Sequence, residues 1–371
     1  MKSISAVDLF CGIGGLTHGL LQSGIRVNAG IDIDKTCRYA YEQNNAAQFI
    51  AEDVREISIS TLRNLYSPNT IRLLVGCAPC QPFSSHTRKY KNRNQDSRWK
   101  LLADFQRFVE GVSPEIIAVE NVPSLQKQGV FTTFVSKLHE LNYSVFPTIV
   151  YCPDYGIPQT RRRLVVLASL LGDISLAPNT HASAHRLPAD TPTMEDLSVQ
   201  QLDSLRPPKT VYATIGDLPA ISDGQISSED PLHRARALSS LNKERIRQSK
   251  PGGTWLDWDA SLRAPCHKRE SGQSYKSVYA RMSWDEPAPT ITTQFYNFGT
   301  GRFGHPEQDR ALSLREGALL QTFPRSYDLI DPSLPISFQR LGTHIGNALP
   351  VQLSMVIGHS IREHLEQVCN G

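Results

Sequence analysis

The sequence predicts an α/β protein with a Rossmann-like, doubly wound and mostly parallel sheet, followed by a second, smaller and loop-rich domain. Three observations support this fold class. Short apolar runs alternate with helical patterns over the first half of the chain, as in sheets covered by helices on both faces. A glycine-rich turn follows the first apolar run, and the alternation stops near residue 170.

The apolar runs define the expected strands. They lie at 6–10, 27–33, 48–53, 71–77, 115–121, 143–151 and 162–169. Helical patterns fall between them, at 16–22, 35–44, 100–110 and 132–141. Ligands bind such sheets beyond the carboxyl ends of the strands, so the functional site is expected there.

Loop residues dominate from 172 to 231, where Pro, Ser, Thr and Asp are frequent. We therefore expect a first domain at 1–174 and a second domain with its hinge at 175–335. A C-terminal segment at 336–371 is expected to return to the first domain, because 349–368 is again helical in pattern.

The composition is typical of a globular protein, since 40% of the 371 residues are apolar and 20% are charged. No stretch is apolar and long enough to span a bilayer, and the start MKSISAVDLF lacks a signal-peptide pattern. The seven cysteines show no disulfide-framework spacing. These features predict a cytoplasmic protein without a membrane partner.

Basic residues gather in three runs, at 86–100, 233–250 and 263–281, although the net charge is only +3. One such run is as typical of a solvated face as of a binding surface. Three runs in one chain favour a polyanion as partner.

The segment DLFCGIGGLTHGL at 8–20 combines a strand, a glycine loop and a helix start. Glycines let a backbone approach a ligand closely, and a helix N-terminus favours anionic groups. The fingerprint G-x-G-x-x-G fails, because Thr17 takes the place of its third glycine, and a simple tight turn is the alternative. Asp32 and Asp53 end the next two strands, where carboxylates would meet a ribose and an adenine amino group. This pattern favours the binding of an adenosine group, and the cofactor that carries it could be either S-adenosylmethionine or a nicotinamide dinucleotide.

The stretch GCAPCQPF at 76–83 holds two cysteines, Cys77 and Cys80. A zinc site needs four ligands, and beyond this pair the sequence offers only Cys266 and His267, so no metal is expected. A redox couple does not account for the glycine loop or the basic runs. A single nucleophile, Cys80, held between Pro79 and Pro82, accounts for most of these features. Cys77 is then a small buried residue of the strand.

Two further motifs lie at the same expected sheet edge. ENV at 120–122 ends a strand, and its Glu120 is either an ion-pair partner or a group that holds a proton against a ring nitrogen. QTRRR at 159–163 precedes another strand. Its Arg161 and Arg163 share a strand face and are suited to a carbonyl or a phosphate.

These motifs together resemble those of the DNA (cytosine-5)-methyltransferases of bacterial restriction-modification systems. The resemblance rests on DLFCGIGG, APCQPFS (78–84), QDSR (95–98), ENV and QTRRR in order. APTITT (288–293), RALSLREGALLQTFP (310–324) and GNALPVQL (346–353) follow after a variable region. The resemblance covers residues 1–170 and about 280–360. Several motifs in the same order identify a family more specifically than any one motif does.

The resemblance implies a reaction and a partner. Cys80 would add to carbon 6 of a cytosine flipped out of duplex DNA, Glu120 would contact ring nitrogen 3, and Arg163, supported by Arg161, would contact the base carbonyl. S-adenosylmethionine would donate the methyl group to carbon 5 and leave as S-adenosylhomocysteine. A cognate restriction endonuclease is a possible companion, and a monomer is expected.

The resemblance also implies binding residues. The cofactor would contact Phe10, Gly12, Ile13, Gly15, Leu16, Asp32, Ile33, Asp53, Val54, Pro79, Leu101 and Asn347. Residues 175–335 would form the target-recognition domain and hinge, with 263–281 reading bases and 86–100 closing over the DNA. The interpreted DNA contacts are Gln81, Ser84, Arg88, Arg98, His267, Lys268, Arg269, Ser274, Tyr275, Lys276 and Arg281.

Two departures from the family pattern stand out. Cys11 takes the place of a frequent alanine, and Ile33 stands where some members have an aromatic residue, so an apolar contact replaces stacking. Transfer RNA is the alternative substrate. A repressor with an inactive site is disfavoured because every chemical group is present, and an amino-group methyltransferase because no D/N-P-P-aromatic motif occurs.

Overall fold

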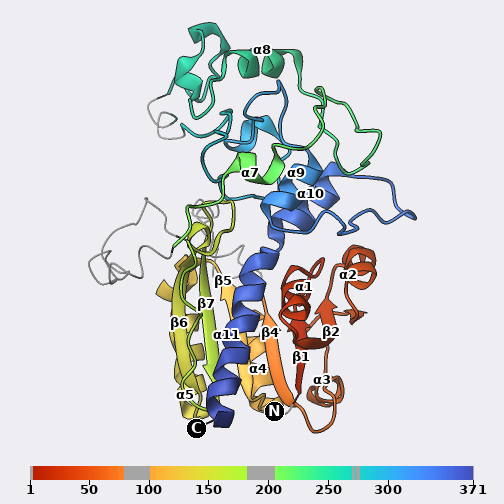
Figure 1. Cartoon of the computed structure of the whole chain (residues 1–371), viewed down its shortest axis with the longest axis vertical. Helices are drawn as coiled ribbons and strands as arrows, with labels where there is room; N and C mark the ends of the chain where they lie inside the picture. Colours follow the sequence, from red (N-terminus) through yellow and green to blue (C-terminus); the bar gives the residue numbers. More distant parts are fainter. Residues whose placement is uncertain (1–2, 79–100, 182–204, 270–271, 273–275, 371) are drawn as a thin grey trace. The chain divides into compact units, whose positions relative to one another are not determined.

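The computed structural model describes residues 3–78, 101–181, 205–269, 272 and 276–370 (Figure 1). The chain divides into two compact units. Unit 1 comprises Met1–Tyr151, Arg162–Pro178 and Ala348–Gly371, and unit 2 comprises Cys152–Arg161 and Asn179–Asn347. The sequence placed the boundaries at 174 and 335, and it assigned 152–161 to the first domain.

Unit 1 is built on a seven-stranded sheet with the strand order β3-β2-β1-β4-β5-β7-β6. Neighbouring strands from β3 to β5 are parallel, and β7 runs antiparallel to both β5 and β6. The predicted mostly parallel sheet is therefore confirmed. The strands are β1 (Ile4–Leu9), β2 (Arg26–Asp32), β3 (Gln48–Ala51), β4 (Ile71–Gly76), β5 (Ile116–Asn121), β6 (Ser144–Tyr151) and β7 (Arg162–Ser169).

Helices cover both faces of this sheet. Alternate strand residues such as Val7 and Leu9 pack with α3, α4 and α5 in the main hydrophobic core. The intervening residue Asp8 faces α1, which packs against α11. The helices of unit 1 are α1 (Gly15–Gln22), α2 (Arg38–Asn44), α3 (Ile59–Asn64), α4 (Leu101–Val112), α5 (Gly129–Glu140) and α11 (Val351–Asn370), with 3-10 turns η1 (Lys35–Cys37) and η6 (Pro123–Lys127).

The return of the C-terminal segment depends on a close contact between α1 and α11. A Cβ atom at Gly19 would lie 2.4 Å from Ser354 Cβ, and one at Gly358 would lie 1.9 Å from Ser23 Oγ. Both distances are far below van der Waals contact, so only glycine allows the two helices to approach this closely.

Unit 2 is loop-rich, and the backbone pairing between its described residues is limited to isolated bridges such as Arg281↔Gly304. A small aromatic core around Trp255, Trp258 and Phe298 holds it together. Its helices are α7 (Val211–Ile215), α8 (Ser240–Gln248), α9 (Leu314–Leu320) and α10 (Phe338–Asn347), with 3-10 turns η7 (Cys152–Tyr155), η9 (Trp255–Asp257), η10 (Ala260–Leu262) and η12 (Phe298–Thr300). None of the helices described in either unit is both long and apolar enough to cross a membrane.

Candidate active site

The strand order creates a topological switch point between β1 and β4. From β1 the chain builds the sheet toward β2 and β3, and from β4 it builds toward β5 on the opposite side. Leu9 and Gly76, the last residues of β1 and β4, are register partners. The glycine loop and the segment that leads to Cys80 therefore start side by side, where open α/β sheets bind ligands.

The glycine loop has a strained backbone that leaves room beside it. Phe10, Gly12 and Gly14 have φ values of 61°, 51° and 86°, in the left-handed region. Such angles are unusual for a non-glycine residue, and Phe10 adopts one at the turn out of β1. No atom lies within 4 Å of where a Cβ would stand on Gly12, so the loop borders open space.

Asp32 at the end of β2 holds this loop in place. Its Oδ2 accepts a hydrogen bond from Gly12 N at 2.9 Å, and its Oδ1 accepts one from Asp34 N at 2.8 Å. The sequence predicted a ribose ligand here but did not reveal this tie to the loop. The next residue, Ile33, is 69% exposed, so a large apolar side chain lies open at the carboxyl edge of the sheet.

The other predicted cofactor residues differ in accessibility. Ile13, Gly15, Leu16 and Val54 are buried and support the loop from inside, whereas Phe10 and Leu101 keep some exposed surface. Asp53 is already engaged: Arg55 Nε lies 3.0 Å from its Oδ1, and this hydrogen bond lowers the pKa of Asp53. An adenine amino group would share that carboxylate with Arg55.

A buried polar chain lies beneath the loop. Thr17 Oγ1 donates to Asp8 Oδ2 at 2.7 Å, so the Tyr41 hydroxyl, 3.0 Å away, is the donor to Thr17. Asp8 is fully buried, and its Oδ1 has no hydrogen-bond partner among the described residues. Burial raises the pKa of Asp8 to about 7, and the nearby charge of Asp32 adds to this effect. Apart from the position of Asp8 before the loop, nothing in the sequence indicates these hydrogen bonds.

Glu120 and Arg163 meet at the end of the sheet, as an ion pair. Arg163 Nε lies 2.6 Å from Glu120 Oε1, and the two side chains are only 13% and 10% exposed. Arg163 Nη1 also donates to Arg162 O at 2.7 Å. Glu120 Oε1 accepts no aligned hydrogen bond from any residue in the described ranges. The pair is thus held by charge, with hydrogen-bonding capacity left for a ligand.

Cys77 lies next to this pair, directly after β4. Packing around its sulfur raises the pKa of the thiol well above its usual range, and the charge of Glu120 raises it further. Cys77 is therefore a neutral thiol and unsuited to act as a nucleophile. The predicted nucleophile Cys80 lies outside the described residues, as do Pro79, Gln81, Ser84, Arg88 and Arg98.

Two predicted site residues belong to unit 2. Arg161 is buried there and donates from Nη1 to Ile291 O at 3.1 Å. Asn347 is exposed and ends α10. The structure thus brings Glu120 and Arg163 together within unit 1, and it describes Arg161 and Asn347 within the other unit.

The predicted DNA contacts include residues that the structure buries. His267 is 4% exposed and stacks on Trp255 with a ring-centroid distance of 4.4 Å. Arg281 is 5% exposed and donates to the backbone carbonyls of Ile246 and His305. Both side chains hold unit 2 together, so we remove them from the DNA-contact set.

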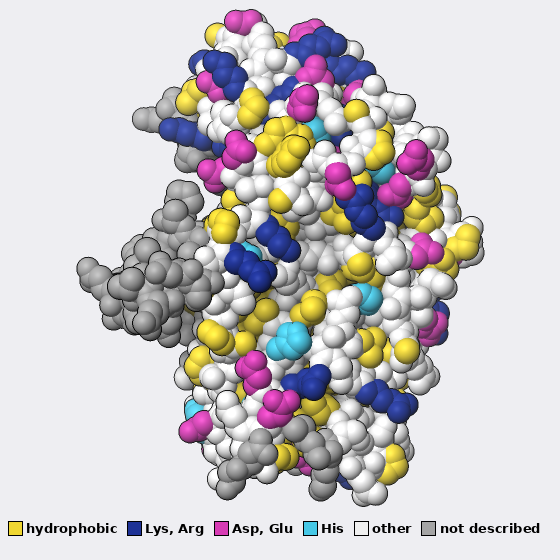
Figure 2. Space-filling view, viewed as in Figure 1, with side chains coloured by type: hydrophobic (Ala, Val, Ile, Leu, Met, Phe, Trp, Pro, Cys, Tyr) yellow, Lys and Arg dark blue, Asp and Glu magenta, His cyan; other side chains and the backbone are white. Residues whose placement is uncertain are grey.

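The remaining predicted cations of that run do face solvent. Lys268, Arg269 and Lys276 are exposed, and Ser274 and Tyr275 lie outside the described residues. Figure 2 shows Lys and Arg side chains in the region of α8, with acidic side chains between them. The visible surface of unit 2 is thus mixed in charge rather than uniformly basic.

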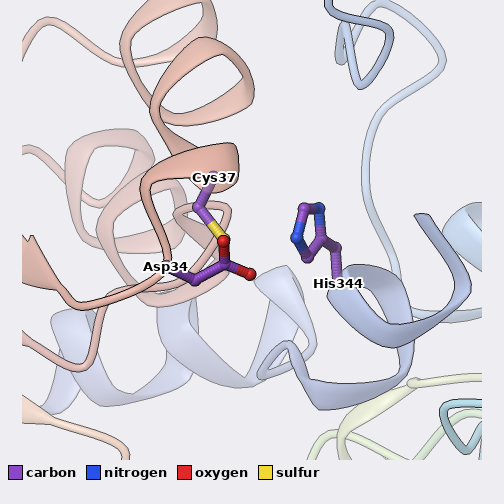
Figure 3. Close-up of side chains that lie close together, drawn as sticks. All are labelled: Asp34, Cys37 and His344. Carbon is purple, nitrogen blue, oxygen red and sulfur yellow. The ribbon is translucent and has the colours of Figure 1, made fainter. Parts of the chain in front are cut away.

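Asp34 and Cys37 lie close together behind the loop (Figure 3). Asp34 caps η1, because its Oδ1 accepts from Thr36 N at 3.0 Å. Burial raises the pKa of Cys37 well above its usual range. His344, also labelled, belongs to unit 2.

Known proteins are similar to this chain along nearly its whole length. The family model for C-5 cytosine-specific DNA methylase matches residues 4–363. The Type II methylase M.HgiDII of Herpetosiphon aurantiacus is 47% identical over 365 residues, which cover 98% of this chain and 96% of that protein. The Type II methyltransferase M.Eco47II of Escherichia coli is 28% identical, and the match covers 98% of this chain and 80% of that protein.

Solved structures support the fold. A putative DNA modification methyltransferase encoded within an E. coli prophage gives a TM-score of 0.69 at 20% identity, covering 98% of this chain and 100% of that one. The Dnmt2 methyltransferase of S. pombe gives a TM-score of 0.59 at 17% identity, and the match covers 98% of this chain and 99% of that one. Because the family model spans most of the chain and a relative approaches half identity, this protein belongs to the C-5 cytosine-specific DNA methylase family.

Proposed function

We propose that the protein is a sequence-specific DNA methyltransferase that transfers a methyl group to carbon 5 of a cytosine flipped out of duplex DNA. The observation that carries this proposal is the Glu120–Arg163 pair beside the topological switch point. It combines a carboxylate with unused hydrogen-bonding capacity and a guanidinium, which suit the ring nitrogen and the carbonyl of cytosine.

The proposed reaction begins when the Cys80 thiolate adds to carbon 6 of the base. Glu120 holds a proton against ring nitrogen 3 and so offsets the negative charge that develops on the ring, while Arg163 and Arg161 hold the carbonyl. Carbon 5 then takes the methyl group that S-adenosylmethionine supplies when bound. Solvent water then takes the carbon-5 proton, the electron pair of that C–H bond restores the double bond between carbons 5 and 6, and the bond from carbon 6 to Cys80 breaks to release the thiolate. Covalent attack divides one difficult step into easier ones, and base flipping costs a few kcal/mol.

The residues around the loop fit S-adenosylmethionine. The open space at Gly12 accommodates a ligand against the backbone, and the exposed Ile33 offers an apolar surface for an adenine ring. Asp32, at the end of β2 beside the loop, would accept hydrogen bonds from the ribose hydroxyls. Pro79, Leu101, Val54 and Asn347 would complete the pocket.

Unit 2 is the proposed target-recognition part. Lys268, Arg269 and Lys276 are its exposed candidates for DNA contact, and the cytosine methylated within a recognised site would depend on them. A restriction endonuclease of the same specificity is a proposed companion, and a cytoplasmic monomer is the proposed form. Transfer RNA remains the alternative substrate, and side-by-side incubation with RNA and duplex DNA separates the two.

The nucleophile test uses labelled cofactor and duplex DNA. Cys80→Ala is expected to abolish methyl transfer and to retain DNA binding. Cys369→Ala, which changes an exposed cysteine at the end of α11, is the matched control and should keep full activity. Turnover by Cys80→Ala at the wild-type rate would overturn the mechanism. Bisulfite sequencing of DNA from expressing cells then gives the flanking sequence of the methylated base.

A further inference from the structure

Three neighbouring strands place Cys77, Glu120 and Arg163 on one face of the sheet. Gly76 of β4 pairs with Val119 of β5, so the next residues along, Cys77 and Glu120, lie side by side. Glu120 in turn pairs with Val165 of β7. Since side chains alternate along a strand, Arg163 shares the face of Val165 and therefore that of Glu120.

The backbone around Cys77 is fixed from two directions. Cys77 N donates to Leu9 O of β1 at 3.3 Å, which continues the β1–β4 ladder by one residue. Asn121 Nδ2 donates to Ala78 O at 2.9 Å, which ties the next residue to β5. The position of Cys77 is therefore set by the sheet, and its thiol is fixed relative to the end of β5.

The register between β4 and β5 places the Cys77 side chain beside that of Glu120, and the thiol interacts electrostatically with the charges of Glu120 and Arg163. The thiol keeps its proton, because burial and the nearby carboxylate raise its pKa well above its usual range. A protonated thiol that bonds a carboxyl oxygen is the donor of that bond. Glu120 is thus flanked by a guanidinium on one side and an S–H group on the other.

We propose that Cys77 is a positioning residue that donates its S–H to Glu120 and keeps this carboxylate oriented toward the cytosine ring. The inference rests on the role proposed for Glu120. It assigns a purpose to the first cysteine of GCAPCQPF that is separate from the nucleophile Cys80.

The physical reason is competition for the carboxylate. A guanidinium presents parallel N–H groups that favour bidentate pairing with a carboxylate. The closest approach of Arg163 to Glu120 is through Nε, and Glu120 Oε1 accepts no aligned hydrogen bond among the described residues. Without a donor on the other flank, Glu120 would be free to turn fully onto Arg163. Both of its oxygens would then be occupied, and ring nitrogen 3 would lose its partner.

The test compares Cys77→Ala, which removes the donor, with Cys77→Ser, which retains one. A bond to a charged group is worth a factor of ten or more, and a thiol is a weak donor, so Cys77→Ala should lower kcat about tenfold. In Cys77→Ala, KM for S-adenosylmethionine and Kd for duplex DNA should stay within about twofold of the wild-type values, because Cys77 binds neither ligand. In Cys77→Ser, kcat should return to within about threefold of the wild-type value. Cys369→Ala should match the wild type in all three quantities.

A second readout isolates the step at the ring. Covalent adduct formation with a duplex that carries 5-fluorocytosine should slow by the same factor in Cys77→Ala and recover in Cys77→Ser. The inference is overturned if Cys77→Ala keeps kcat within twofold of wild type, or if Cys77→Ser is as slow as Cys77→Ala at equal melting temperature. If Cys77→Ala unfolds at the assay temperature, Cys77→Ser decides alone, and a tenfold loss there overturns the inference. Inactivity of Cys80→Ala alongside full activity of Cys77→Ala would refute this inference and leave the proposed function standing.

Discussion

Asp8 in unit 1 and Glu316 in unit 2 are both fully buried carboxylates, yet their environments are opposite. Arg310 donates from Nη1 and Nη2 to the two carboxylate oxygens of Glu316 at 2.8 and 2.7 Å, and Ser313 N donates to Glu316 Oε2 at 2.7 Å. The charge of Arg310 prevails over burial and lowers the pKa of Glu316 to about 2. Asp8 has no such counter-charge among the described residues, so burial prevails over its hydrogen bonding with Thr17 and raises its pKa to about 7.

The difference separates polar groups that hold the structure from those at the site. Unit 2 has a small aromatic core, and its buried Arg310, Arg281 and Glu316 are tied into networks of hydrogen bonds. Unit 1 is held by a large apolar core. Its buried carboxylates Asp8 and Glu120 lie at the carboxyl edge of the sheet, and each keeps one oxygen that has no aligned hydrogen-bond partner in the described part of the chain.

The largest expected effect is on the stability of unit 2. Glu316→Gln leaves the fully buried Arg310 without its counter-charge, and breaking such a pair costs about 3–5 kcal/mol of unfolding free energy. Urea denaturation measures this loss. The exposed Glu307→Gln serves as control and should change stability by less than about 0.5 kcal/mol. A loss below about 1 kcal/mol for Glu316→Gln would show that the pair does not hold unit 2.

The second prediction contrasts two Glu–Arg pairs near the two ends of β5. Glu120→Gln should lower kcat about a hundredfold or more, because the carboxylate is proposed to act on the ring. Glu115 pairs with Arg72 at 2.7 Å just before the start of β5, so Glu115→Gln should lower stability but leave kcat unchanged. Equal kcat losses in both variants would remove the special role of Glu120.

The third prediction is the pH dependence of stability. The pKa of Asp8 is raised above its unfolded value, so its ionisation destabilises the fold progressively as pH rises from about 4 to about 7. The pKa of Glu316 is lowered, so its stabilisation is complete above about 4.5 and is lost as pH falls toward about 2. Denaturation across this range should show that Asp8→Asn removes the decline between pH 4 and 7. An unchanged slope in Asp8→Asn would rule out Asp8 as its source.

The smallest effect concerns the exposed apolar residue at the edge of the sheet. Ile33→Ala removes side-chain area proposed to pack on the adenine, which should weaken S-adenosylmethionine binding about five- to tenfold. Ile149→Ala, at a residue of β6 that is 41% exposed, is the control and should leave cofactor affinity unchanged. Calorimetric titration of both variants measures this. Equal affinity of Ile33→Ala and Ile149→Ala for S-adenosylmethionine would show that the adenine does not pack on Ile33.

The strands were predictable because buried parallel strands are continuous apolar runs, and β4, β5 and β7 appear almost where 71–77, 115–121 and 162–169 were expected. The six-residue helix α3 was missed because it is too short to show a helical period. The irregular loops of unit 2 have no period at all.

The site was predictable where a motif ends a strand, as for Glu120 and Arg163. Residue type alone misled for His267 and Arg281, because a basic run does not reveal which side chains turn inward. The contact of Cys77 with Glu120 was also missed, since it depends on the register between β4 and β5. That register is set by long-range pairing, which a single sequence does not display.

The most direct test of the central claim is to identify the methylated atom. Duplex DNA is incubated with the protein and labelled S-adenosylmethionine, digested to nucleosides and separated. The proposed chemistry predicts that the label elutes with 5-methyldeoxycytidine and is absent when Cys80→Ala replaces the wild type. Label on an exocyclic amino group of cytosine or adenine, or transfer by the Cys80→Ala variant, would contradict it.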